Sequence, residues 1–254
     1  MKVHQMMYGL LLAPLLLPVT IPAHGGHRQI VRAEPMLPYT PPPAAAELLR
    51  HAAANFMKTR ALQFALVAHQ IPAGLHLSGV AGGDGSAIWP DHLVFQGSIQ
   101  QTPALAMSFV MVMCGPAQYI ELGDGVFQQI PGAPNVGRLL FAPDTSFVAN
   151  VLLHLEQPST PQAATLEQVA TWHLTGTIPN KVLAPLTGVG GPGPVQAELW
   201  IGQQDLRLHQ VTLRGAMFTG DSAQTTRTLS FSHFDEHLTL TVPRGQLPCG
   251  APKT

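Results

Sequence analysis

The hydrophobic positions of this chain follow two different periods. From Ala44 to Arg60 the apolar residues recur at spacings of three and four, which predicts an amphipathic helix. Beyond this helix most apolar residues alternate with polar ones, a pattern typical of β-strands that bury one face. We therefore expect a domain that begins with a helix and continues mainly as antiparallel sheet. The apolar face of the helix consists of Leu48, Leu49, Ala52, Ala53, Phe56 and Met57.

The strands are expected where the alternation is regular, with turn-forming residues between them. The glycine-rich segment 79–85 is predicted to form the loop between the first two strands, with Asp84-Gly85 as a hairpin turn. A change of apolar parity between Leu208 and Val211 predicts a β-bulge that bends its strand. The expected strands are residues 62–66, 92–99, 104–113, 119–122, 126–130, 172–178, 196–201, 206–215, 227–234 and 238–242.

Two shorter helices are predicted to interrupt the series of strands. One is capped by Asp144 or Thr145 and places Phe147 on its apolar face. The other spans residues 180–186. The predicted fold class is therefore α+β, with the helices outnumbered by the strands.

The segment 104–113 carries large, flexible apolar side chains on one face of its predicted strand. Small residues and valines occupy the other face. Because unbranched thioethers adapt to irregular acyl chains, this stripe could line a ligand cavity. Ordinary sheet core beneath a helix is the alternative, and the residues alone leave both interpretations open. The candidate lining residues are Leu93, Phe95, Leu105, Met107, Phe109, Met111, Met113 and Leu199.

The N-terminal segment is organised differently from the rest of the chain. Met1-Lys2 supplies a positive start, Leu10 to Ile21 a short apolar stretch, and Ala23-His24-Gly25 a cleavage site, which together predict a signal peptide and export. A buried N-terminal segment is the alternative. The expected boundaries are 1–25 for the signal peptide, 26–43 for a proline-rich linker, 44–245 for the folded domain and 246–254 for a C-terminal tail.

Composition and charge exclude several classes of protein. Basic and acidic residues number 13 and 14, which leaves no basic surface of the kind that nucleic-acid binding requires. Charged residues make up 11% of the chain and hydrophobic residues 46%, the reverse of a disordered composition. The longest apolar run, Leu10 to Pro18, is too short to span a bilayer.

The sequence contains no recognisable catalytic motif. Gly-x-Ser-x-Gly, His-Glu-x-x-His and Cys-x-x-Cys are all missing, so we expect neither an enzyme nor a cofactor. Residues 188–193 match Gly-x-Gly-x-x-Gly, but a proline and a strand follow, which favours a loop.

Two groups of residues could carry other chemistry. His233, Asp235 and His237 would share one face of an extended strand and could bind a metal, although we expect a polar turn and no metal there. The two cysteines, Cys114 and Cys249, are an even number in an exported chain, so a disulfide between them is possible.

Several modest motifs follow one another in a characteristic order and spacing. They are Ala46-Glu-Leu-Leu, the run Trp172-His-Leu-Thr-Gly-Thr-Ile-Pro179, Glu198-Leu-Trp-Ile-Gly202 followed by Arg207-Leu208, and Leu229-Ser-Phe-Ser-His-Phe-Asp-Glu236. In this order and spacing they resemble the LppX/LprAFG family of bacterial envelope lipoproteins. The resemblance extends from Ala44 to Gly245 and depends on the order of the motifs rather than on any single one.

The resemblance implies a strongly curved antiparallel sheet, a half-barrel, with helices covering its concave face around an apolar cavity. It implies a carrier of acylated lipid or glycolipid in the cell envelope, in transient contact with membranes, and we expect a monomer that binds no nucleic acid. The sequence departs from the family in one respect: its first cysteine is Cys114, so the usual lipobox cysteine is missing and N-terminal acylation is in doubt. The alternative function is an interaction or sensing protein of LolA/RseB-like fold that docks a partner polypeptide.

Overall fold

The computed structural model of the protein describes residues 43–74, 77–90, 92–131, 146–187, 193–243 and 246–248. The predicted signal peptide and almost all of the predicted linker lie outside these residues. The described elements are α1 (Ala45–Lys58), β1 (Ala61–His69), the 3-10 helix η1 (Leu77–Gly79), β2 (Val80–Ile88), β3 (His92–Thr102), β4 (Leu105–Cys114), β5 (Ala117–Glu121), β6 (Gln128–Gln129), α3 (Phe147–Leu153), β7 (Gln162–Leu166), β8 (Val169–Ile178), α4 (Asn180–Thr187), β9 (Val195–Gly202), β10 (Leu208–Arg214) and β11 (Thr226–Ser232).

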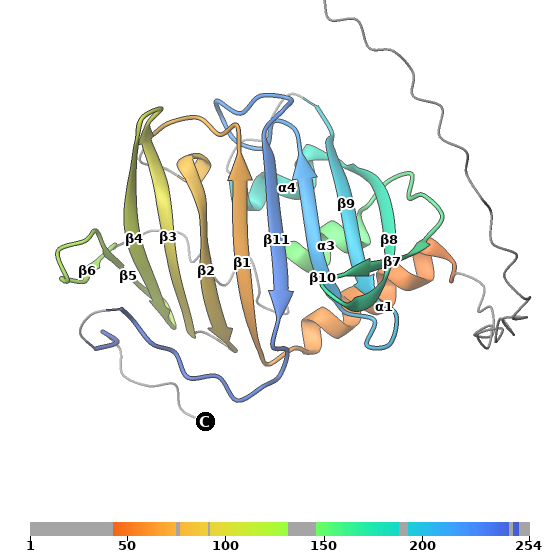
Figure 1. Ribbon diagram of the computed structural model, residues 1–254, viewed down its shortest axis with the longest axis horizontal. Helices are drawn as coiled ribbons and strands as arrows, with labels where there is room; N and C mark the ends of the chain where they lie inside the picture. The colour runs from red at the N-terminus through yellow and green to blue at the C-terminus, as the bar shows by residue number, and fades with distance from the viewer. Residues whose placement is uncertain are drawn as a thin grey trace, which may run out of the picture. The chain divides into compact units, whose positions relative to one another are not determined.

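All the strands belong to one open antiparallel sheet of 11 strands, in the order β6-β5-β4-β3-β2-β1-β11-β10-β9-β8-β7. Strands β1 to β6 form one half and β7 to β11 the other, and each half is a meander of sequential neighbours (Figure 1). The halves join where β1 pairs with β11, the first and last strands of the chain. The predicted antiparallel sheet is confirmed.

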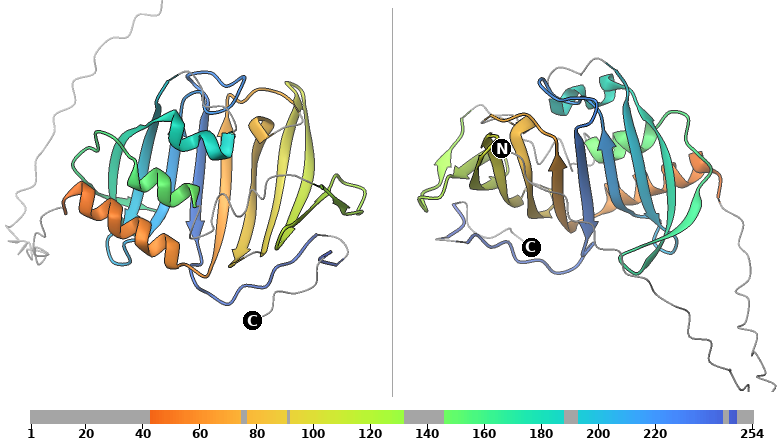
Figure 2. Two further views of the ribbon diagram at one scale, coloured as in Figure 1. Left: turned by 180° about the vertical axis from the view of Figure 1, so that it is seen from behind. Right: turned by 45° about the horizontal axis from the view of Figure 1, so that its top comes forward.

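The three described α-helices lie against one face of the sheet, over the half formed by β8 to β11 (Figure 2). The predicted amphipathic helix is confirmed as α1, and its apolar face is buried through Leu48, Ala52 and Phe56. We call this side of the sheet the inner face and the opposite side the outer face. Burying one stripe of a helix on one face of a sheet builds a two-layer core.

The glycine-rich segment 79–85 is not a loop, contrary to the sequence-based expectation. It forms the start of β2, and Asp84-Gly85 lies in mid-strand, paired with β1 and β3. Glycine here serves packing rather than turning, because a Cβ on Gly85 would lie 2.3 Å from Cζ of Phe64. Close approach of a neighbouring ring therefore explains a composition that resembles a turn.

Residues 238–242 form no strand, which corrects a second expectation. Strand β11 is already paired on both sides, by β1 and β10, so the chain that follows finds no free edge beside it. Instead Leu240 packs on the outer face against Val94, Val110 and Val112, with Val242 and Leu247 at the margin. The C-terminal segment therefore covers part of the outer face of β3 and β4.

Cys114 ends β4 beside this outer cluster and is disulfide-bonded. Cys249 lies outside the described residues, so its pairing with Cys114 stays a prediction.

The remaining elements agree with the sequence in outline and differ in detail. The register shift between Leu208 and Gln210 confirms the predicted bulge. Helix α3 is capped by Ser146, whose Oγ accepts a hydrogen bond from the Ala149 N–H (3.2 Å), so the predicted caps Asp144 and Thr145 are wrong. Strand β7 was not predicted. The glycine loop 188–193 lies outside the described residues except for its last residue.

Candidate functional site

A row of five phenylalanines crosses the inner face from helix α1 to strand β4. Phe56 of α1 meets Phe231 of β11 edge to face, with ring centroids 5.3 Å apart. Phe231 is the register partner of Phe64 on β1, and Phe64 stacks on Phe95 of β3 at 5.8 Å. Phe95 meets Phe109 of β4 edge to face at 5.7 Å. We call these residues the phenylalanine row; it links both halves of the sheet.

The row can form only because glycine separates two of its rings. Gly85 of β2 pairs with Phe64 on one side and with Phe95 on the other. The two rings are nearly parallel, at 12°, and the ring of Phe64 lies where a side chain at position 85 would stand. Gly97 does the same for the ring of Phe95, whose Cε1 would lie 2.8 Å from an added Cβ. Missing side chains on β2 and β3 thus make the space that the aromatic rings fill.

Most of the candidate lining residues on β3 and β4 lie around this row. Leu93 pairs with Met113, and Phe95 pairs with Met111, on the inner face. Met113 is 2% exposed and Met111 is half-buried against the same cluster. Exposure varies along the inner face of β4: Phe109 is buried between the half-buried Met107 and Met111, and Leu105 is 53% exposed.

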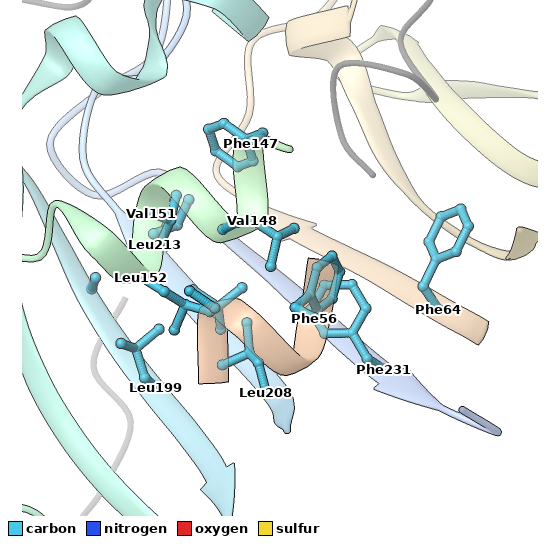
Figure 3. Packing of buried hydrophobic residues seen from close by; sticks show 14 of the residues in the cluster. Phe56, Phe64, Phe147, Val148, Val151, Leu152, Leu199, Leu208, Leu213 and Phe231 are labelled. Carbon is cyan, nitrogen blue, oxygen red and sulfur yellow. The ribbon is translucent and has the colours of Figure 1, made fainter. Parts of the chain in front are cut away.

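Leu199 lies apart from the other candidate lining residues. It belongs to β9, in the half of the sheet that the helices cover, and is 0% exposed. Figure 3 shows it beside Leu208 of β10 and Leu152 of α3, within the packed layer between helices and sheet. The structure therefore places Leu199 in ordinary core packing.

A buried ion pair lies at one end of β11. Arg227 donates two hydrogen bonds to the Asp221 carboxylate (2.7 and 2.9 Å) and a third to the Ser78 carbonyl oxygen (2.9 Å). The side chain of Asp221 is 0% exposed and also accepts from the backbone N–H groups of Met217 and Phe218. The ion pair joins β11 to the β10–β11 loop, and the Arg227 bond to Ser78 connects them to the segment before β2, in the other half of the sheet.

The side chains of the inner face are mainly hydrocarbons, with the thioethers of methionine among them. Within the described ranges, no three His, Cys, Asp or Glu residues are grouped as a metal site would require. His233 and Asp235, which were considered as metal ligands on an extended strand but expected in a polar turn, lie in a turn with positive φ (51° and 58°). Such a face can exclude water and hold apolar groups.

Sequence reasoning missed three members of the phenylalanine row, Phe56, Phe64 and Phe231. Phe56 was expected on the apolar face of its helix and the other two within strands, but nothing in a single strand reveals that their rings meet across strands. The signal in the sequence was the position of two glycines. Gly85 and Gly97 each occupy a strand position whose partner on the neighbouring strand is a phenylalanine, Phe64 and Phe109 respectively.

Comparison with known proteins gives a family and two similar structures. The model of the family described as LppX_LprAFG lipoprotein matches residues 44–240. The crystal structure of LprF from Mycobacterium bovis is similar, with a TM-score of 0.63 and 15% identity, covering 82% of this chain and all of that one. LppX from Mycobacterium tuberculosis has a TM-score of 0.55 and 18% identity, covering 78% and 99%. No curated protein matches the sequence.

Proposed function

This chain belongs to the LppX/LprAFG lipoprotein family, and from that premise we propose that it is a carrier that binds acylated lipid or glycolipid within the cell envelope. The likeness to LprF and LppX supports the fold, at 15% and 18% identity. The observation that carries the function is the continuous apolar inner face, which extends from beneath the helices to strand β4.

The proposed cavity lies over the half of the inner face formed by β1 to β4. The described helices lie over β8 to β11, so this half keeps its aromatic and methionine side chains without a helix of the described chain above them (Figure 2). We place the concave side of the sheet here, with Phe95, Phe109 and Met111 lining the cavity. Each methylene of an acyl chain buried there would contribute about 0.8 kcal/mol.

The carrier makes and breaks no bond in this proposal. An acyl chain needs a dry, adaptable surface, and the thioether of Met111 offers one without a polar group that would need a partner. None of the described helices is long and apolar enough to cross a membrane. We propose an exported monomer that touches membranes only while it loads and unloads lipid.

Native mass spectrometry of the full chain, exported by its own N-terminal segment, tests the proposal. We expect the folded protein to carry additional masses that dissociate as lipid, and to bind a fluorescent long-chain fatty acid after delipidation. Met111→Lys should abolish both signals, because it places a charge among hydrocarbon. Leu105→Lys is the matched control on the same face of the same strand, and it should leave both signals intact because Leu105 is already exposed.

A bare mass together with no fatty-acid binding by the delipidated protein would contradict the proposal. Capture of a defined envelope polypeptide by such a lipid-free protein would instead favour the docking function that similar scaffolds suggest.

A further inference from the structure

A polar cleft lies at the opposite end of β11 from the Arg227–Asp221 ion pair. Its volume is about 480 Å³, and it forms where the C-terminal end of α1, the β9–β10 turn and the chain leaving β11 meet (Figure 1). Volumes of this order are usual for small-ligand sites. Two motifs of the sequence, Arg207-Leu208 and residues 229–236, converge here. Leu208 and Phe231 of these motifs pack on the inner face, but Arg207 and Glu236 have no role there, so the cleft requires its own explanation.

The walls of the cleft are held by hydrogen bonds between elements distant in sequence. Asn55 of α1 donates through Nδ2 to the carbonyl oxygens of Asp205 (3.1 Å) and Leu206 (3.3 Å). Arg207 donates to the Asp235 carboxylate, which also accepts from the Arg60 N–H at 2.6 Å. These bonds tie the helix, the turn and the segment after β11 into one frame, so the cleft is formed before any ligand arrives.

Three non-glycine residues in this frame adopt left-handed backbone conformations. They are Leu206 (φ 49°), His233 (φ 51°) and Asp235 (φ 58°). The left-handed region costs of order 1 kcal/mol or more for such residues, most of all for a branched one such as leucine. The surrounding hydrogen bonds maintain this strain, and it aims His233 and Phe234 at the cleft.

The charges that line the cleft balance. Asp205 and Arg207 line it, and each has a partner outside the lining: Nε2 of His209 lies 3.0 Å from Asp205, and Asp235 is paired with Arg207. Burial alone would raise the pKa of each carboxyl. The hydrogen bonds from His209 to Asp205, and from Arg60 and Arg207 to Asp235, outweigh burial, so both pKa values lie below 3.8.

Two further charges line the cleft without a partner. Lys58 and Glu236 form no ion pair within the described part of the chain, and they carry opposite signs. A site with one unpaired charge of each sign has no net preference for an anion or for a cation. The balance therefore favours a neutral ligand.

Donors and acceptors alternate around the cleft. Both described contacts of the Asn55 amide use its Nδ2, so its Oδ1 remains an acceptor, and Glu236 adds two more acceptor oxygens. Lys58 and the remaining N–H groups of Arg207 are donors, with the guanidinium carbon 5.0 Å from the Phe234 ring centroid. A hydroxyl group both donates and accepts, so a ligand with several hydroxyls satisfies such a wall. We infer that this cleft binds a neutral saccharide.

The experiment uses the full chain and a panel of neutral mono- and disaccharides, with binding read by saturation-transfer NMR and a glycan array. We expect at least one saccharide to bind, with an affinity that changes less than about twofold between 50 and 500 mM salt, because no ion pair is involved. Lys58→Met and Glu236→Ala should each weaken it by about two- to tenfold, the loss of one hydrogen bond. Lys181→Met and Glu156→Ala, exposed residues elsewhere, are the matched controls and should bind normally.

Two further measurements distinguish a free saccharide from a lipid headgroup. If free saccharide binds equally to the Met111→Lys variant, the ligand is a soluble or wall glycan; if only an acylated saccharide binds, and Met111→Lys abolishes it, the ligand is a lipid headgroup. Binding of neither, or stronger binding of phosphate or phosphocholine than of any saccharide, overturns the inference. The lipid masses described above are an independent readout, so failure here leaves the carrier function standing.

Discussion

The two halves of the sheet use the same inner face in different ways. In the half formed by β7 to β11, helices α1 and α3 lie on the sheet, and the side chains between them, such as Leu199 and Leu208, are fully buried. In the half formed by β1 to β6, the face is equally apolar, but the described helices do not lie over it (Figure 2). On β4 the exposure ranges from the buried Met113 and Phe109, through the half-buried Met111, to the exposed Leu105.

The presence or absence of a described helix above the sheet divides one continuous apolar layer into a part that stabilises the fold and a part that we propose binds lipid. A helix that covers a sheet fills the space above it, as close packing of side chains requires. Over β1 to β4 no described helix lies above the sheet. There Phe95 is buried, but the half-buried Met111 and the exposed Leu105 leave a surface that we propose a ligand completes. The phenylalanine row connects the two halves. We expect substitutions in β7 to β11 mainly to lower stability, and substitutions in β1 to β6 mainly to weaken lipid binding.

The largest effect is expected where the halves are fastened together. Arg227→Met leaves the Asp221 carboxylate buried without its partner, which should lower the free energy of unfolding by about 4 kcal/mol. Urea denaturation measures the change. Replacing both partners, in Arg227→Met with Asp221→Asn, removes the uncompensated charge and should recover part of the loss.

Arg214→Met is the control for this substitution, because Arg214 lies on the neighbouring strand but is exposed. It should change the free energy of unfolding by less than about 0.5 kcal/mol. Equal effects of the two substitutions would show that the ion pair does not join the halves.

A pair of truncations compares the two halves directly. Leu199→Ala should cost about 3 kcal/mol, because it opens a cavity in a fully packed layer. Met111→Ala should cost about 1 kcal/mol, since Met111 is only half-buried, yet it should weaken fatty-acid binding more than Leu199→Ala does. Thermal unfolding measures the loss of stability, and the fluorescent fatty acid measures the loss of binding. If Met111→Ala lowered stability more and binding less than Leu199→Ala, the distinction between the halves would be wrong.

The glycine that separates two rings of the row offers a smaller effect. Gly85→Ala forces the ring of Phe64 away from Phe95, which should cost about 2 kcal/mol and alter acyl-chain binding. Gly193→Ala is the matched control, because nothing lies within 4 Å of its added Cβ. It should be neutral or slightly stabilising. A neutral Gly85→Ala would mean that the rings do not need this space.

The smallest effect concerns pH. The pKa values of Asp205 and Asp235 lie below 3.8 in the folded protein, so the unfolded chain binds protons first as the pH falls. Their contribution is present at neutral pH and is lost on acidification through and below pH 3.8. For Asp235, which is partly exposed, it should stay below about 1 kcal/mol. Asp235→Asn should flatten the dependence of the urea midpoint on pH; an unchanged slope would contradict the pairing with Arg207.

The sequence predicted the parts of the fold that depend on local periodicity. The apolar stripe of α1 and the parity switch at Leu208 are local patterns, and both were identified correctly. The incorrect predictions concern segments whose structure depends on residues distant in sequence. Gly85 looks like a turn residue until the ring of Phe64 on the neighbouring strand is known, and residues 238–242 look like a strand until β11 is found to have both edges occupied.

The sequence could indicate candidate lining residues, but not where they lie relative to the helices. The stripe on β4 identified the relevant face, because large flexible side chains on one parity indicate a buried side. Periodicity cannot say whether a helix lies above a residue, so Leu199 and Met111 received the same interpretation although one belongs to packed core and the other to the open half. The polar cleft was beyond sequence reasoning, since its walls come from residues more than a hundred positions apart, such as Asn55 and Asp205.

Photo-crosslinking with a diazirine-bearing long-chain fatty acid tests the distinction between the halves most directly. The label is equilibrated with the delipidated full chain, activated, and located by peptide mass spectrometry. We predict that the labelled residues lie on β3 and β4, around Phe95 and Met111, and that Met111→Lys abolishes the labelling. Labelling that is spread evenly over the chain, or concentrated on β9 and β10 around Leu199, would contradict the account.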